Sequence, residues 1–61
     1  SRQQAADLFG LDGDQLAALN RRELTRLYRR KAHELHPDKG GDSDRFVRLT
    51  AAYEELLSSL P

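Results

Sequence analysis

The 61-residue chain contains no cysteine, methionine or tryptophan. Without cysteine it has no disulfide framework and no thiolate metal site. No apolar run approaches the ~20 residues that span a bilayer, and no basic and apolar leader opens the sequence. At this length folding removes only ~60% of the unfolded chain's surface from water, which leaves little apolar area to line a deep substrate pocket. These absences favour one small domain that is not an enzyme.

Charge of neither sign is in excess over the whole chain, because ten basic residues balance ten acidic ones. A neutral protein is not expected to rely on general attraction to polyanions. The charges are nevertheless sorted, since residues 21–35 carry six Arg or Lys residues against two Glu, a local charge of +4. Long side chains covering a solvated helix face would give the same pattern. The scarcity of acids on this face favours an acidic partner surface. At helical spacing the face comprises Arg22, Arg26, Arg29, Arg30 and His33.

Apolar residues recur at helical spacing throughout, and no segment alternates with the period of a strand. The pattern predicts a short helix at about 3–9, ended by Gly10, and a long one at 21–35. Asn20 is the expected N-cap of the long helix, with Glu23 in the capping-box position, and Pro37 ends it. A further helix is expected at about 43–58. Residues 11–15 suggest a loop or turn, residues 15–20 are ambiguous, and an extra helical turn within residues 12–20 is left open.

The predicted fold is all-α, with one domain over residues 1–61. Because the connection at 36–42 is short, the two long helices should form an antiparallel hairpin with the first helix packed across it. A cap at Asp42 or Ser43 would start the last helix. The predicted apolar positions are Ala5, Leu8, Phe9, Leu11, Leu16, Leu19, Leu24, Leu27, Tyr28, Ala32, Leu35, Phe46, Leu49, Thr50, Tyr53, Leu56, Leu57 and Leu60.

The strongest candidate for a binding site is the sequence His36, Pro37 and Asp38, where the basic helix ends. Proline fixes its own φ and stiffens the helix exit, so Asp38 is held near a defined place. A carboxylate at such a corner can form a directed pair with an arginine of a partner. A local Asx turn, with Asp38 bonded to its own backbone, is the structural alternative.

Three stretches occur in a familiar order: "DLFGL", then "LHPDKGGD" at the end of the basic helix, then "RFVRLTAAYEELL". Together they resemble the J-domain of the DnaJ (Hsp40) co-chaperone family, over residues 5–57. The "HPDKGGD" form is similar to the J-domains of polyomavirus T antigens and of some mitochondrial import co-chaperones. The fourth helix of that family, and its Gly/Phe-rich and zinc-binding regions, have no counterpart here. The link before Tyr28 is longer than in bacterial DnaJ, and Thr25 and Lys31 depart from the family's usual residues.

The resemblance implies an Hsp70 partner, whose ATPase domain the second helix and the loop would contact and whose ATP hydrolysis they would stimulate. Asp38 would pair with an arginine of the Hsp70. The implied partner-binding residues are His36, Pro37, Asp38, Lys39, Tyr28, Arg26, Arg29 and Arg30. The resemblance implies no catalytic residue, metal, cofactor or small-molecule substrate in the chain itself. We expect a monomer, cut from a larger protein for which a membrane anchor is compatible with the sequence, with this domain in the cytoplasm.

Four other functions are alternatives to this one. A basic helix after a turn could belong to a nucleic-acid reader, although the neutral charge disfavours it. A J-like scaffold that binds nucleic acid or another protein without stimulating an Hsp70 is the main alternative. His33, His36 and Asp38 are too few clear ligands for a zinc site. His36 and Asp38 lack the nucleophile and pocket that an enzyme would need.

Overall fold

The computed structural model describes residues 1–36, 38 and 43–60. Its elements are α1 (Arg2–Leu8), α2 (Gly13–Ala17), α3 (Arg21–Leu35) and α4 (Ser43–Ser59), with no strand in the described ranges. The predicted all-α fold class is confirmed. The long helices lie within about a residue of the ranges expected from sequence. The expected cap at Asp42 lies outside the described residues, and Ser43 is the first residue of α4.

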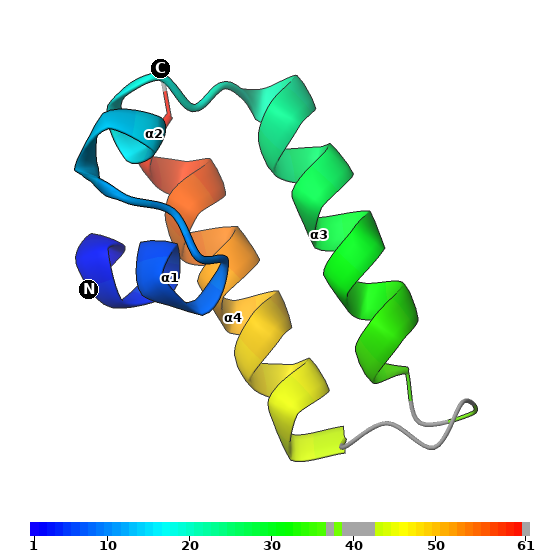
Figure 1. Ribbon diagram of the computed structural model, residues 1–61. Helices are drawn as coiled ribbons and strands as arrows, with labels where there is room; N and C mark the ends of the chain where they lie inside the picture. The colour runs from blue at the N-terminus through cyan, green and yellow to red at the C-terminus, as the bar shows by residue number, and fades with distance from the viewer. Residues whose placement is uncertain (37, 39–42, 61) are drawn as a thin grey trace.

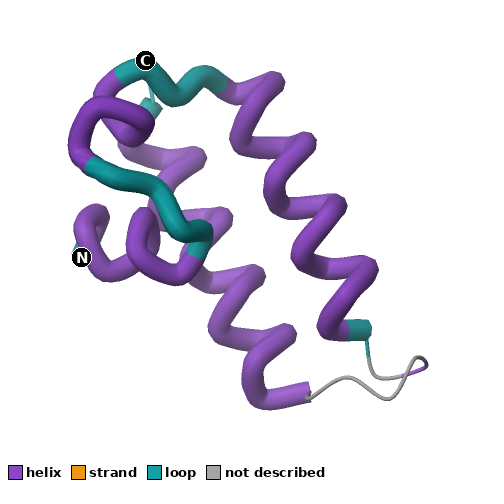
Figure 2. The backbone as a smooth tube through the Cα atoms, viewed as in Figure 1, coloured by secondary structure: helices purple, strands orange, loops and turns teal. Residues whose placement is uncertain are grey.

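α3 and α4 lie side by side and run in opposite directions, so the end of α3 and the start of α4 are at the same end of the molecule (Figure 1). α1 packs mainly against α4. The two loops that flank α2 carry the chain from α1 to the start of α3 (Figure 2), so α2 lies at the other end of the α3–α4 pair. No helix within the described ranges is long and apolar enough to cross a membrane.

The end of α1 confirms the role expected for Gly10. Gly10 has φ +72°, a conformation that glycine adopts without steric cost. Its N–H donates to the Asp7 carbonyl at 3.0 Å, and the Leu11 N–H donates to the Ala6 carbonyl at 3.0 Å. These two bonds satisfy the last carbonyls of the helix and turn the chain toward α2.

α2 shows that the extra helical turn left open within residues 12–20 forms, and that it begins inside the loop predicted for residues 11–15. The Asp12 carboxylate accepts a hydrogen bond from the Gln15 N–H at 2.7 Å, and the Gln15 side chain accepts one from the Asp12 N–H at 2.9 Å. This reciprocal capping box starts a helix at Gly13, despite the turn preference of the Asp-Gly-Asp sequence. The helix buries Leu16, and Leu19 is buried just after it, as predicted.

The start of α3 confirms only half of the predicted capping box. The Asn20 side chain accepts a hydrogen bond from the Glu23 N–H at 2.8 Å, so Asn20 is the N-cap. The Glu23 carboxylate does not return a bond to Asn20. It bonds the guanidinium of Arg26 one turn further along α3, and charged partners form the stronger hydrogen bond.

Asn20→Ala is expected to lower the free energy of unfolding by ~1 kcal/mol, because the substitution leaves the Glu23 N–H without its cap. Urea denaturation followed by circular dichroism measures the change. Asn20→Asp keeps an accepting oxygen and serves as the matched control. Equal denaturation midpoints for the alanine variant and the wild type would contradict the role of this cap.

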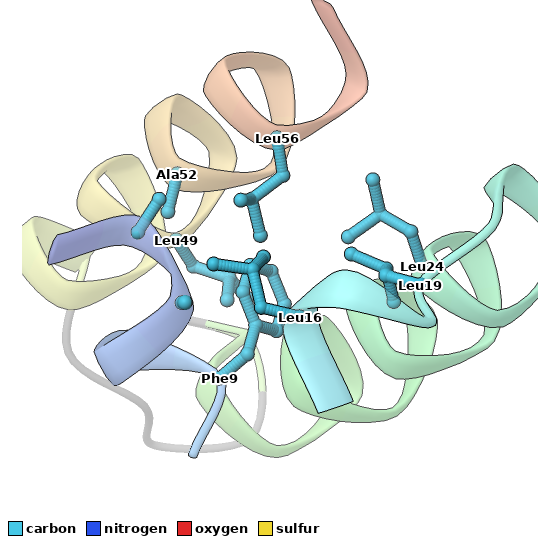
Figure 3. Packing of buried hydrophobic residues seen from close by; sticks show 9 residues of the cluster. Phe9, Leu16, Leu19, Leu24, Leu49, Ala52 and Leu56 are labelled. Carbon is cyan, nitrogen blue, oxygen red and sulfur yellow. The ribbon is translucent and has the colours of Figure 1, made fainter. Parts of the chain in front are cut away.

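The core lies where α1, α2, α3 and α4 meet (Figure 3). Leu24, Leu49 and Leu56 are fully buried. The remaining buried residues are Ala5, Ala6, Phe9, Leu16, Leu19 and Ala52. The residues packed partly buried against this cluster are Leu11, Leu27, Tyr28, Ala32, Leu35, Tyr53, Leu57 and Leu60. Leu8 differs from the other predicted apolar positions, since it stays 40% exposed.

Candidate functional site

The chain leaves α3 at His36, whose backbone is extended with φ −61° and ψ 132°. This is the conformation expected of a residue that precedes proline. The Asp38 N–H donates a hydrogen bond to His36 Nδ1 at 3.2 Å, which places the proton of a neutral ring on Nε2. The Asp38 carboxylate oxygen Oδ2 lies 3.7 Å from the same nitrogen. Local contacts therefore fix Asp38 relative to the His36 ring.

A second set of contacts attaches this corner to α4. The His36 ring meets the ring of Phe46 edge-on, with centroids 5.7 Å apart and an interplanar angle of 81°. The Thr50 hydroxyl donates to the Phe46 carbonyl at 3.1 Å and lies 3.2 Å from the Tyr28 hydroxyl. Because Thr50 has one proton to donate, Tyr28 is the donor in that second bond. The Tyr28 ring stacks on Tyr53 at 4.3 Å, so contacts run without a break from the middle of the hairpin to His36.

The two polar side chains of the corner differ in exposure. The Asp38 side chain is 89% exposed, whereas that of His36 is 48% exposed. Asp38 thus presents its carboxylate to solvent while its backbone is tied to His36. A shallow hollow beside the corner is lined by Tyr28, Arg29, Ala32, His33, His36, Asp38 and Phe46.

The structure brings only some of the predicted partner-binding residues together. Tyr28, Arg29, His36 and Asp38 surround the hollow at the corner. Arg26 lies nearer the start of α3, where it lines a separate surface depression that also reaches Arg29. Arg30 lines a third depression with Phe9 and Leu27, on another side of α3. Pro37 and Lys39 lie outside the described residues.

Arg26 differs from the expectation that the basic face of α3 has few acidic partners. Its guanidinium makes two hydrogen bonds with the Glu23 carboxylate on the same helix. The bond to Arg26 holds the pKa of Glu23 below its usual value, and the same bond raises the pKa of Arg26. Part of the positive charge of Arg26 is therefore compensated by Glu23 within α3. Within the described part of the chain, Arg29 and Arg30 have no carboxylate at ion-pairing distance.

The corner offers little to a metal ion. Among the described His, Asp and Glu side chains, no group of three is placed to hold one. His36 Nδ1 already accepts the Asp38 N–H. The corner is arranged to present a carboxylate, and the neighbouring surface to present cations.

Phe46 and Thr50 are the residues of this region whose part sequence reasoning missed. Both were predicted only as inward-facing positions of the last helix. Their contacts with His36 and Tyr28 join residues on opposite sides of the loop, and no local pattern reports such contacts. The apolar spacing of α4 was the available signal, and it indicates burial alone.

Comparison with known proteins gives relatives of two kinds. The small t antigen of BK polyomavirus is 39% identical over 57 residues, which cover 92% of this chain and 33% of that protein. The large T antigen of the same virus is 39% identical over 57 residues and 8% of its length. Chaperone protein dnaJ A6 of Oryza sativa subsp. japonica is 53% identical over 34 residues, 56% of this chain and 8% of that protein.

The chain therefore spans about a third of the small t antigens and a much smaller part of the other relatives. No family model matches the sequence, and no solved structure matches it. The viral similarity extends over nearly the whole chain, and the structure is the all-helical one that the sequence predicted. The similarity to both viral T antigens and a plant DnaJ chaperone, on this fold, shows that the chain belongs to the J-domain family.

Proposed function

We propose that this J-domain binds the ATPase domain of an Hsp70 chaperone and stimulates its ATP hydrolysis. The observation that carries the proposal is the exposed Asp38 carboxylate, whose backbone is bonded to His36 while His36 packs on Phe46 of α4. A carboxylate fixed in this way loses little freedom when an arginine of the partner binds it. Such a pair supplies direction and specificity at one point of the contact.

The basic side chains of α3 would have a different task. Exposed Arg29 and Arg30 have no carboxylate partner within the described residues, so they add to the positive field of this helix. Cations at the rim of an interface accelerate encounter and orient the partner more than they add to final affinity. Arg26 would contribute less, because Glu23 compensates it. Tyr28 would supply apolar contact area beside Arg29 in the hollow at the corner.

In this proposal the chain is an activator and performs no catalysis itself. The Hsp70 supplies the nucleotide site and the residues that hydrolyse ATP, and the J-domain binds the state that hydrolyses faster.

Single-turnover ATP hydrolysis by a bacterial Hsp70 tests the proposal directly. The chain is titrated into a preformed Hsp70–ATP complex, and a saturable rise in hydrolysis rate is expected. A folded chain that leaves several different Hsp70s unstimulated would contradict the proposal. Nucleic-acid binding would then become the function to measure.

Reversing Arg29 and Arg30 together to glutamate is expected to weaken association roughly tenfold at low salt, since exposed charge pairs contribute up to ~1 kcal/mol each. The salt dependence of binding should also fall. Titration calorimetry or fluorescence anisotropy at two ionic strengths gives both values. The matched control reverses Arg2 and Arg48, which changes the net charge equally from α1 and α4. If both double variants bound alike, total charge and not the α3 surface would govern association.

A further inference from the structure

A second hollow lies on the opposite flank of α3 from the His36–Asp38 corner, where the end of α1 meets α3 and α4. Its apolar lining comes from Leu8, Leu35 and Leu49, one from each helix, and its charged lining includes Lys31, Glu34 and Arg48. It shares no residue with the hollow at the corner. Its volume is about 150 Å³.

The hollow carries side chains of both charges. Its lining includes Lys31 and Arg48 beside the Glu34 carboxylate. Of the described residues, none places a carboxylate within ion-pairing distance of Lys31 or Arg48. Lys31 is half-buried, so its stem covers apolar surface while its ammonium reaches the rim. Lys31 and Arg48, which have no carboxylate at ion-pairing distance among the described residues, thus lie beside the exposed Leu8 and the half-buried Leu35.

This combination selects among ligands. Inorganic phosphate would pair with the cations but leave the exposed part of Leu8 in contact with water. A purely apolar group would cover the leucines but leave the cations uncompensated. A ligand that carries carboxylates next to a large apolar group satisfies both parts of the lining. The exposed edge of Leu8, at 40%, gives such a group further area to contact.

We propose that this hollow binds a short acidic peptide segment of a partner protein. One aromatic or large aliphatic side chain of the segment packs against Leu8 and Leu35, and neighbouring carboxylates pair with Lys31 and Arg48. The site shares no lining residue with the hollow at the His36–Asp38 corner, whereas Lys31 and Glu34 also line the depression beside Arg30. The inference does not depend on stimulation of an Hsp70.

Nuclear magnetic resonance of the ¹⁵N-labelled chain tests the proposal with an amidated, acetylated peptide of sequence Gly-Ser-Glu-Phe-Asp-Glu-Ser-Gly. The expected amide shifts lie around Leu8, Lys31 and Leu49. Replacing the phenylalanine of the peptide by serine should weaken binding roughly tenfold or more, because the apolar contact is lost. Replacing its acids by their amides should weaken binding roughly fivefold or more.

Variants of the chain separate this site from general attraction to α3. Lys31→Glu and Arg48→Glu should each weaken peptide binding roughly fivefold. Glu34→Gln should strengthen it, because the one acid of the lining is removed. Arg22→Glu makes the same charge reversal on α3 outside this hollow and should leave the shifts at Leu8 and Leu49 unchanged. Circular dichroism confirms that each variant is folded. Because Arg48 is exposed and Lys31 is half-buried, Arg48→Glu is expected to disturb the fold less than Lys31→Glu.

Three results would overturn the proposal. The first is no shift at millimolar peptide, and the second is a set of shifts confined to Tyr28 and His36. The third is equal binding of the acidic peptide and its amide form. Inorganic phosphate and phosphatidylserine vesicles are run in parallel. If either produced the same shifts and lost them equally in Arg48→Glu, the ligand would be a phosphate or an anionic lipid, and the peptide assignment would be wrong.

Discussion

Asp38→Asn is expected to abolish stimulation of an Hsp70 ATPase while leaving the helices intact. The substitution is nearly isosteric, and the bond from the Asp38 backbone N–H to His36 does not involve the carboxylate. Because the side chain is 89% exposed, folding does not depend on its charge. Removing one member of a charge pair that becomes buried in an interface costs about 2–5 kcal/mol, which weakens the complex by roughly thirtyfold or more. Single-turnover hydrolysis measures the loss.

The matched control is Asp14→Asn, which removes an exposed carboxylate from α2, at the end of the molecule away from the corner (Figure 1). It should stimulate as the wild type does. Circular dichroism of both variants verifies the fold. Undiminished stimulation by Asp38→Asn would show that the Hsp70 does not bind this carboxylate. The residues that stimulate the ATPase would then lie elsewhere on the chain.

The sequence was most informative where the signals are local. α3 has Asn20 at its start and Pro37 after its end, and its predicted bounds agree with the structure. α2 was harder to predict because two local signals compete over the same residues. Asp-Gly-Asp favours a turn, yet Asp12 and Gln15 cap each other and start a helix.

The site was predictable in part, for a similar reason. The adjacency of His36 and Asp38 follows from the chain itself, so sequence alone could place them together. The support from Phe46 depends on the direction in which α4 returns after the loop, which is a property of packing. Glu23 and Arg26 have the i, i+3 spacing of an ion pair, which is visible in the sequence. The capping-box position of Glu23 also allowed a bond to the backbone N–H of Asn20. Only the structure decides between these two partners.

The hollow next to Lys31 was not predicted. From sequence, Lys31 stands on the apolar stripe of the long helix and is expected to extend its charge to the edge of that stripe. The structure places it beside Arg48 of another helix. The two residues are far apart in sequence and on different helices, so no spacing rule relates them. A site formed by residues of different helices is therefore not predicted from the pattern of any one helix.

Leu56→Ala is expected to destabilise the fold by about 2–5 kcal/mol, because it removes a fully buried side chain and leaves a cavity. A core of this chain length rarely supplies more than ~3–5 kcal/mol, so a large fraction of the variant should be unfolded. Thermal and urea denaturation by circular dichroism measure the loss. Val47→Ala, on the same helix but at a position 66% exposed, should change stability by less than ~0.5 kcal/mol.

The same variant separates the scaffold from the site. The His36 ring rests on Phe46 of α4, so unfolding of α4 should remove stimulation in proportion to the unfolded fraction. Trimethylamine N-oxide favours compact states and should restore both the helix signal and the stimulation of Leu56→Ala. It should restore nothing in Asp38→Asn, which is folded already. A Leu56→Ala chain that denatured with the same midpoint as Val47→Ala would contradict the burial of Leu56. A Leu56→Ala chain that the osmolyte refolds but that still fails to stimulate the Hsp70 would show that the core also sets the geometry of the His36–Asp38 corner.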